Sequence, residues 1–143
     1  MALASLMAGI SFTNAGLGAV HAMSFPLGGK FHVPHGVANA ILLPVVMEFN
    51  AKGNFRVFKK IAELMGECVE GLADREAALK SAKAVKELCK DIGIPNISEF
   101  GVKEGDLPQM AADTMKIQRL LSGNPRRVSE KDILCIFKNA LSG

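Results

Sequence analysis

The near absence of charge from the first third of the chain is the strongest constraint on its fold. Of 17 basic and 14 acidic residues, residues 1–50 contain just Lys30 and Glu48. Because unpaired charges are almost never fully buried, an uncharged segment is typical of a buried one. We therefore expect the opening to be a buried helix and residues 51–143 to face water on one side. So long an apolar opening also indicates that a large partner surface, or more chain, covers it.

Composition excludes several classes of protein. Hydrophobic residues make up 49% of the chain and charged residues 22%, which excludes an intrinsically disordered protein. A net charge of +3 is too small to favour nucleic-acid binding. The chain has no Trp or Tyr, so an RNA-stacking surface or an aromatic cage is poorly supplied. We expect no nucleic-acid partner.

A membrane span and a signal peptide are the other interpretations of the opening segment. Asn14, His21 and Pro26 interrupt its apolar run, and no basic residue precedes it. A span requires about 20 continuous apolar residues, and a signal peptide requires a basic start. A buried helix therefore fits the segment better, and we expect no membrane partner.

The apolar residues recur with helical spacing along the chain, and no alternating run demands a strand. The pattern predicts a first helix over 2–24 that Pro26 ends, followed by a loop over 27–33. Pro34 suits the start of a second helix, which reaches about residue 49.

Three further helical stripes and one capping signature complete the pattern. The stripes cover residues 55–65, 79–92 and 110–121. Asp74 is a candidate N-cap, and Ser129 with Asp132 forms a capping box before a last helix. The expected fold is all-α, a bundle of about six helices.

The cysteines indicate a reducing compartment. Their number is odd, their spacing is wide and no CxxC pair occurs: Cys68, Cys89 and Cys135. Disulfides and cysteine metal sites are not expected, and the cytoplasm fits this usage.

The histidines offer a candidate metal site. His21 precedes the predicted loop and His35 follows it, so both rings can point into one cleft, while His32 lies between them in solvent. Imidazole binds zinc and iron, but a metal needs further ligands. Glu48 is roughly four helical turns from His35, too far to complete the site. The spacing leaves two interpretations open: metal ligands, or capping and buried polar residues.

Four segments together resemble the signature of the iron-containing alcohol dehydrogenases. They are AGISFTNAGLGAVHAM at 8–23, PLGG at 26–29, PHGVANA at 34–40 and LLP at 42–44. Weaker similarity continues at 92–95, 99–102 and 123–126, so the resemblance covers essentially the whole chain.

The resemblance implies where the chain belongs in a longer enzyme. Family members have a nucleotide-binding α/β domain, then a helical domain of the dehydroquinate synthase-like type. Iron, sometimes zinc, lies between them on an Asp and three His, and His21 and His35 match the last two ligands. This sequence matches neither the other two ligands nor the glycine-rich dinucleotide loop. Residues 1–143 are thus expected to be a single helical domain, with NAD(P) bound mainly elsewhere.

The implied activity is hydride transfer between NAD(P)H and an aldehyde or ketone, giving the alcohol. Fe(II) or zinc would polarise the carbonyl. The partners expected are a small alcohol or aldehyde and further copies of the protein. The alternative is a non-catalytic helical fragment that self-associates as a dimer through residues 1–25.

Several residues in or beside these segments are candidates for further roles. Phe12 matches a position that lines the substrate pocket, or it packs in the core. Phe25 stands where many relatives have a proton-passing His, and this form is similar to 4-hydroxybutyrate dehydrogenases, which suggests a hydroxy acid. Lys30 faces a carboxylate or solvent, and Arg126 and Arg127 attract phosphate or form a solvated turn.

Overall fold

Every regular element of the chain is a helix. The computed structural model describes residues 1–143 and contains eight α-helices and two short 3-10 helices. They are α1 (Ala2–Ala15), α2 (Ala19–Phe31), α3 (His35–Ala51), α4 (Phe55–Leu64), α5 (Asp74–Asp91), η1 (Ile97–Phe100), η2 (Glu104–Asp106), α6 (Leu107–Met115), α7 (Gln118–Leu121) and α8 (Glu130–Ser142). The all-α prediction is confirmed, but about six helices become eight because two predicted segments are each broken.

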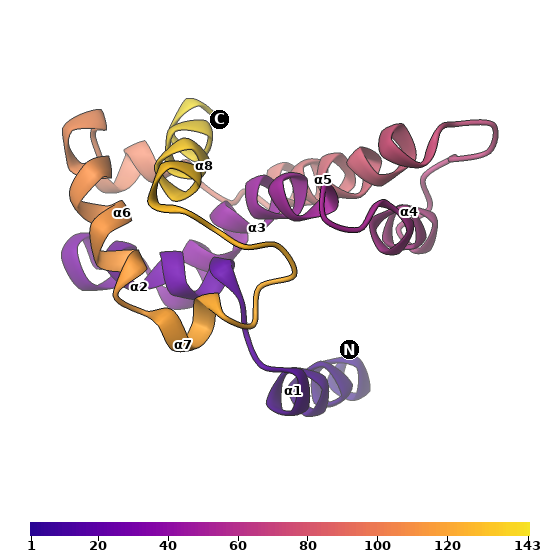
Figure 1. Cartoon of the computed structure of the whole chain (residues 1–143), viewed down its shortest axis with the longest axis horizontal. Coiled ribbons are helices and arrows are strands. Elements are labelled where there is room, and N and C mark those ends of the chain that lie inside the picture. The colour runs from indigo at the N-terminus through magenta and orange to yellow at the C-terminus, as the bar shows by residue number, and fades with distance from the viewer.

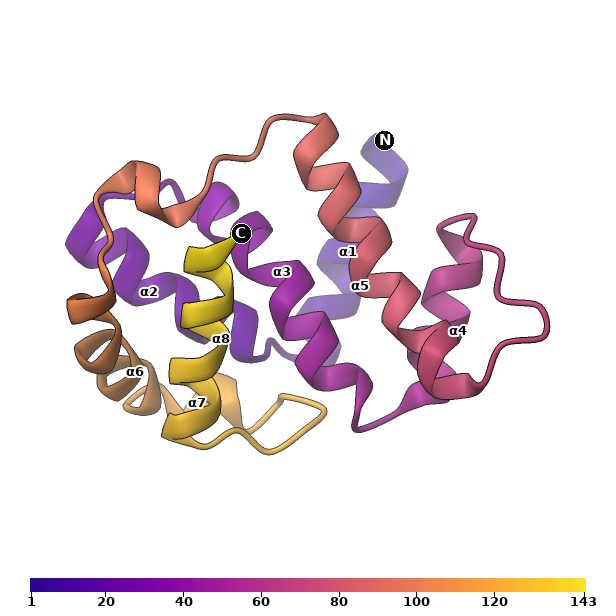
Figure 2. The same cartoon turned by 90° about the horizontal axis from the view of Figure 1, so that it is seen from above.

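Helix α3 is the centre of the arrangement. It packs against α2 and α8 on one side and against α5 on the other (Figures 1 and 2). The main core lies between α2, α3, α6 and α8, and its largest fully buried side chains include Phe137, Met23, Leu27 and Leu42. Two small clusters join α4 to α5. The layout places the start of α3 beside α2, where the predicted site residues lie.

The predicted helix over 2–24 is wrong, because the chain breaks after Ala15. Helices α1 and α2 meet at 102°. The break is fixed from outside: a Cβ on Gly123 would lie 2.5 Å from the Leu17 carbonyl oxygen, and one on Gly18 would lie 2.9 Å from Asn124 Oδ1. Only glycine permits so close an approach at both positions.

Pro26 does not end α2, and the predicted loop over 27–33 is also wrong. The helix continues to Phe31, although proline removes one backbone hydrogen bond and crowds the preceding turn. Met23 and Leu27 are both fully buried in the core, and their burial stabilises the helix on either side of the proline. The helix closes at His32, which adopts a left-handed conformation with φ 55°.

The other boundaries follow local signals with two differences. The Ser129 box is confirmed: its hydroxyl accepts from the Asp132 N–H, and its own N–H donates to the Asp132 carboxylate. The N-cap of α5 is Ala73, and Asp74 is instead the first helical residue, paired with Lys59 at 3.0 Å. The stripe over 110–121 divides into α6 and α7, because a turn at its middle carries the following leucines into the core.

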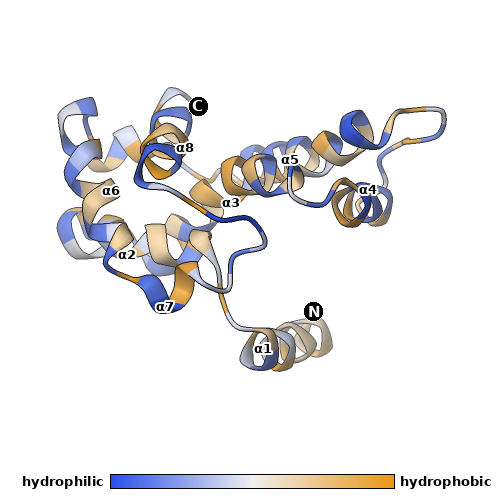
Figure 3. Cartoon of the chain, viewed as in Figure 1, coloured by the Kyte–Doolittle hydropathy of each residue, from blue (hydrophilic) through white to orange (hydrophobic).

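Helix α1 stands apart from the rest and has no buried residue (Figures 1 and 3). Within this chain the expected burial of the opening is therefore found in α2, where Ala22 and Met23 are fully buried, and not in α1. Leu3, Leu6, Met7 and Ile10 are each more than half exposed. A helix that is apolar all round is typical of a buried one, so α1 lacks the surface that would cover it. No single helix is long and apolar enough to cross a membrane; α1 and α2 pass that test only as a bent pair.

Candidate functional site

The structure brings His21 and His35 together. Their ring centroids lie 5.4 Å apart, with the planes inclined at 56°. His21 projects from the first turn of α2, and His35 is the first residue of α3. Residues 32–34 carry the chain back along α2, and the Val33 carbonyl passes 3.6 Å from a Cβ built on Gly28. The pairing was predicted, but a returning linker produces it rather than the long loop expected. His32 is exposed at the end of α2.

Polar neighbours hold both nitrogens of the His35 ring. The Ser24 hydroxyl lies 3.3 Å from Nδ1, and the Asn39 amide nitrogen lies 3.0 Å from Nε2. The Asn39 carbonyl oxygen is buried with no hydrogen-bond partner. Because a buried unpaired acceptor is costly, its position beside His35 marks a place suited to a further polar group.

His21 is the more buried ring of the pair. Burial lowers the pKa of His21, and the nearby charge of His35 lowers it further. A lower pKa keeps the imidazole neutral near pH 7, and the neutral ring is the form that binds a metal. No group of three or more His, Cys, Asp or Glu side chains in the chain could hold an ion. The pair therefore offers two nitrogens that need ligands from other residues.

The two phenylalanines differ in their relation to the pair. Phe25 is half exposed, and its ring meets that of His35 edge to face, with the centroids 6.4 Å apart and the planes inclined at 68°. Phe12 is also half exposed, but it lies on α1, across the break from His21, and belongs to none of the apolar clusters. A core role for Phe12 within this chain is therefore wrong.

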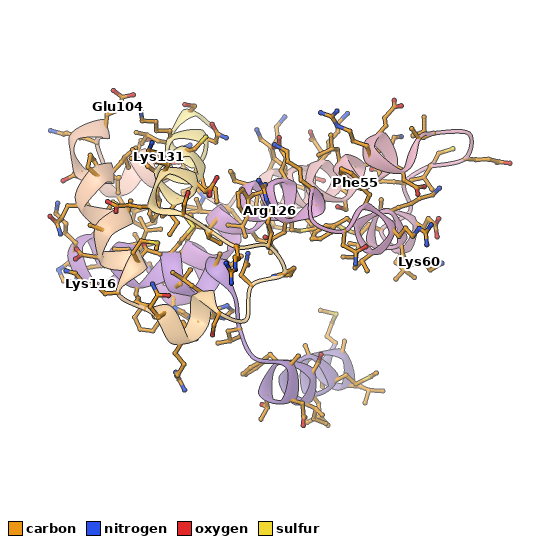
Figure 4. The ribbon with its side chains drawn as sticks, in the orientation of Figure 1. Phe55, Lys60, Glu104, Lys116, Arg126 and Lys131 are labelled. Carbon is orange, nitrogen blue, oxygen red and sulfur yellow. The ribbon has the colours of Figure 1, made fainter.

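The candidate anion-binding cations have partners inside the chain. Lys30 lies in the last turn of α2, not in a loop, and its amine is 2.6 Å from the Asp106 carboxylate. This hydrogen bond lowers the pKa of Asp106. Arg126, which Figure 4 labels, lies in the segment between α7 and α8. It donates to the Phe49 carbonyl at 3.1 Å and stacks over the Phe49 ring at 3.9 Å. Arg126 is therefore a packing residue rather than part of a solvated turn, whereas Arg127 is exposed.

A partly buried pair of amide side chains that sequence reasoning missed fixes the start of α2. Asn50 and Asn124 exchange side-chain hydrogen bonds of 3.1 and 2.7 Å. Asn124 also accepts from the backbone N–H of Ala19 at 3.1 Å, which caps α2 two residues before His21. The one available signal was the short similarity over 123–126, which contains Asn124 but not its partner.

A separate cavity of about 620 Å³ lies between α3, α5 and α8. Its lining includes Pro44, Val45 and the lysines Lys80, Lys83 and Lys86, together with Glu48 and Glu76. Neither histidine of the pair contributes to it, and its charges are mixed in sign. The cavity is therefore distinct from the candidate site.

Comparisons with known proteins identify what the chain resembles. A family profile described as "Fe-containing alcohol dehydrogenase family, C-terminal" matches residues 1–141. The 1,3-propanediol dehydrogenase of Klebsiella pneumoniae is 50% identical over 141 residues, covering 98% of this chain and 36% of that protein. The NAD-dependent methanol dehydrogenase of Bacillus methanolicus is 40% identical over 142 residues, covering 99% of this chain and 37% of that protein.

A solved structure agrees with these relatives. The crystal structure of a 1,3-propanediol oxidoreductase superposes with a TM-score of 0.91 at 48% identity, covering 96% of this chain and 36% of the other. The chain thus spans little more than a third of the length of the proteins that it matches.

Proposed function

Because the chain belongs to the iron-containing alcohol dehydrogenase family, we propose that it supplies part of the metal site of an enzyme that interconverts an alcohol and an aldehyde or ketone with NAD(P). The observation that supports this most directly is the short distance between His21 and His35, whose ring centroids lie 5.4 Å apart. The NAD-dependent relative supports the cofactor class, and the relatives' names support small alcohols as substrates.

The residues present fit a metal ion in three respects. Two imidazoles face one space, His21 is kept neutral by burial, and an unpaired buried oxygen lies beside His35. Iron(II) and zinc both accept imidazole with carboxylate. The bound ion supplies a Lewis acid that polarises the substrate carbonyl. In this proposal His21 and His35 are two of four protein ligands, and the residues that this chain does not contain supply the others.

The aromatic side chains shape the approach to the pair. Phe25 places an apolar ring beside His35 and has no group that could pass a proton. When the alcohol is oxidised, its C–H hydrogen would go to NAD(P) as hydride, and the hydroxyl proton would leave through another group or through water. Phe12 lines the substrate pocket once α1 is covered. Lys30 is already paired with Asp106, so it is not available to a substrate carboxylate. An uncharged alcohol therefore fits better than a hydroxy acid.

The compartment and assembly belong to the same proposal. The three cysteines are unpaired thiols in the structure, which suits the reducing cytoplasm. The uncovered apolar surface of α1 supports further copies, or the rest of a longer protein, as partners.

A fusion protein tests the proposal. The chain replaces the matching part of the Klebsiella 1,3-propanediol dehydrogenase, and NADH oxidation with a small aldehyde is measured beside metal content. We expect about one bound metal per chain and clear activity. His21→Ala and His35→Ala should each lose the metal and at least a hundredfold in rate, since a metal needs its full ligand set. His32→Ala, a matched exposed control, should keep both. A fully active His35→Ala fusion would contradict the proposal.

A further inference from the structure

One buried hydroxyl group connects the two histidines. Ser24 lies in α2 with 1% of its surface exposed. Its oxygen is 2.8 Å from the backbone carbonyl oxygen of His21, which can accept a hydrogen bond but cannot donate one. The single hydroxyl hydrogen of Ser24 is therefore committed to His21.

This commitment fixes the role of Ser24 toward the other ring. Its oxygen lies 3.3 Å from Nδ1 of His35, and with its hydrogen used it can act there as an acceptor alone. The contact is a hydrogen bond only if Nδ1 of His35 carries the hydrogen. A neutral imidazole carries one ring hydrogen, so Nε2 then holds a lone pair.

The opposite edge of the ring agrees with this assignment. The Asn39 amide nitrogen, a donor, lies 3.0 Å from Nε2 of His35. A lone pair on Nε2 accepts this bond, whereas a hydrogen on Nε2 would oppose it. If the oxygen and nitrogen of the Asn39 amide exchanged places, an acceptor would face Nε2, and Nε2 would have to carry the hydrogen. The Ser24 contact disfavours that tautomer because it needs the hydrogen on Nδ1. The Asn39 contact is thus compatible with the tautomer that the Ser24 contact selects.

We propose that Ser24 is a positioning residue that holds neutral His35 in the Nδ1–H form and so keeps on Nε2 a lone pair, which accepts from Asn39 here and is the one a metal would bind in its place. The metal part rests on the proposed function; the tautomer does not. The partner of one ring nitrogen decides which nitrogen is free to bind a metal. Because the same hydroxyl bonds the backbone of His21, it also ties the orientation of one ring to the position of the other.

The tautomer is measured by long-range ¹H–¹⁵N correlation on the ¹⁵N-labelled 143-residue chain, at a pH where its histidines are neutral. In the unmodified chain we expect a hydrogen on Nδ1 of His35 and none on Nε2. Ser24→Thr keeps the hydroxyl and should keep this pattern. Ser24→Val has nearly the same shape without the hydroxyl, and most molecules should carry the hydrogen on Nε2. The exposed His32 is an internal control that should not change.

A second measurement addresses the metal. In the fusion protein, the zinc affinity of the Val variant should fall about tenfold below that of the Thr variant, as for other groups that orient a metal ligand. A hydrogen on Nε2 of His35 in the unmodified chain overturns the proposal, even if the variants do not fold. So does an unchanged tautomer in the Val variant, or equal zinc affinity in the two variants. A fusion that binds no zinc while His35 shows the expected tautomer contradicts the proposed function instead.

Discussion

Asn124 controls the position of His21 although it lies far along the chain. Its side chain caps the first turn of α2 through the Ala19 N–H and exchanges two hydrogen bonds with Asn50 on α3. Asn50 is buried, so each lost partner would leave a polar group without water. One amide therefore connects the start of α2 to the end of α3, the two helices that carry the histidines.

Replacing Asn124 by Ala should destabilise the fold. The Asn50 amide and the Ala19 N–H would lose their partner, which costs about 2–3 kcal/mol on the scale of buried unpaired groups. Urea unfolding followed by far-UV circular dichroism measures the change in unfolding free energy. Asn139→Ala, which removes an exposed amide from α8, should change it by less than about 0.5 kcal/mol. Equal effects at the two positions would contradict the role of Asn124.

Contacts of this kind could not be predicted from the sequence. Asn50 and Asn124 are separated by 74 residues, and no local pattern pairs one asparagine with another over that distance. Arg126 likewise has its partner, Phe49, on another helix. The closeness of the histidines was predictable because they flank a short segment, and their proposed role as metal ligands comes from family resemblance rather than from spacing.

At the scale of elements, helix boundaries were predicted correctly where residues close in sequence determine them, and wrongly where distant residues do. The Ser129 box depends on residues three apart, so its hydrogen bonds follow from sequence alone. The prediction at Pro26 was wrong because a tertiary effect, burial of Met23 and Leu27, outweighed a local one. The break at residues 16–18 depends on Gly123 and Asn124, which approach from a distant turn.

Two glycine substitutions should have opposite effects on these elements. Gly29 lies inside α2, and nothing lies within 4 Å of an added Cβ. Gly29→Ala should therefore raise the unfolding free energy by about 0.5–1 kcal/mol, since alanine favours the helix. Gly123→Ala should lower it, because its Cβ would lie 2.5 Å from the Leu17 carbonyl oxygen. Thermal and urea unfolding measure both, and a stabilising Gly123→Ala would show that the break is not a tight contact.

The Ser129–Asp132 capping box that begins α8 should make the free energy of unfolding depend on pH. The Ser129 hydroxyl and N–H bonds lower the pKa of Asp132 below its ordinary 3.8. A depressed folded-state pKa stabilises the chain above the ordinary value, and this stability is lost as pH falls through the folded value. We expect Asp132→Asn to remove about 1 kcal/mol at pH 7 and little at the acid end. Glu130→Gln, in the same turn, is the control; an Asp132→Asn effect independent of pH would contradict the argument.

At the scale of the whole molecule, charged residues distinguish the surface that faces water from the apolar surface of α1, which nothing in this chain covers. Most charged residues of α4, α5 and α8 are exposed, while α1 has no charged residue and no buried one; most of its ribbon has the hydrophobic colour (Figure 3). The superposition on the 1,3-propanediol oxidoreductase covers 96% of the chain. Because α1 contains 14 of the 143 residues, the superposed part includes at least some of α1. Sequence alone could indicate that a partner surface or more chain covers the opening, but not that residues 2–15 would have no buried residue within this chain.

Self-association of the 143-residue chain should follow from this uncovered surface. Because water penalises exposed apolar area by about 25 cal/mol per Å², α1 should pair with another copy. Sedimentation should show a dimer whose melting midpoint rises with protein concentration. Leu6→Asp or Ile10→Asp should give monomers, whereas Lys83→Asp on an exposed face of α5 should not. A monomer at high concentration, with a midpoint independent of dilution, would contradict the expected dimer.

The separation of α1 also divides the chain into parts with different opening rates. The bonds that cap α2 come from Asn124 rather than from α1, so α2 to α8 do not depend on α1 for their order. An isolated helix of this length is marginal in water, and local unfolding should expose its amides repeatedly. Backbone amides of residues 2–15 should therefore exchange with deuterium at nearly the free-peptide rate in dilute monomer, while those of α2 and α3 remain protected. The same amides should slow by orders of magnitude once α1 is covered, so their exchange rate directly reports assembly.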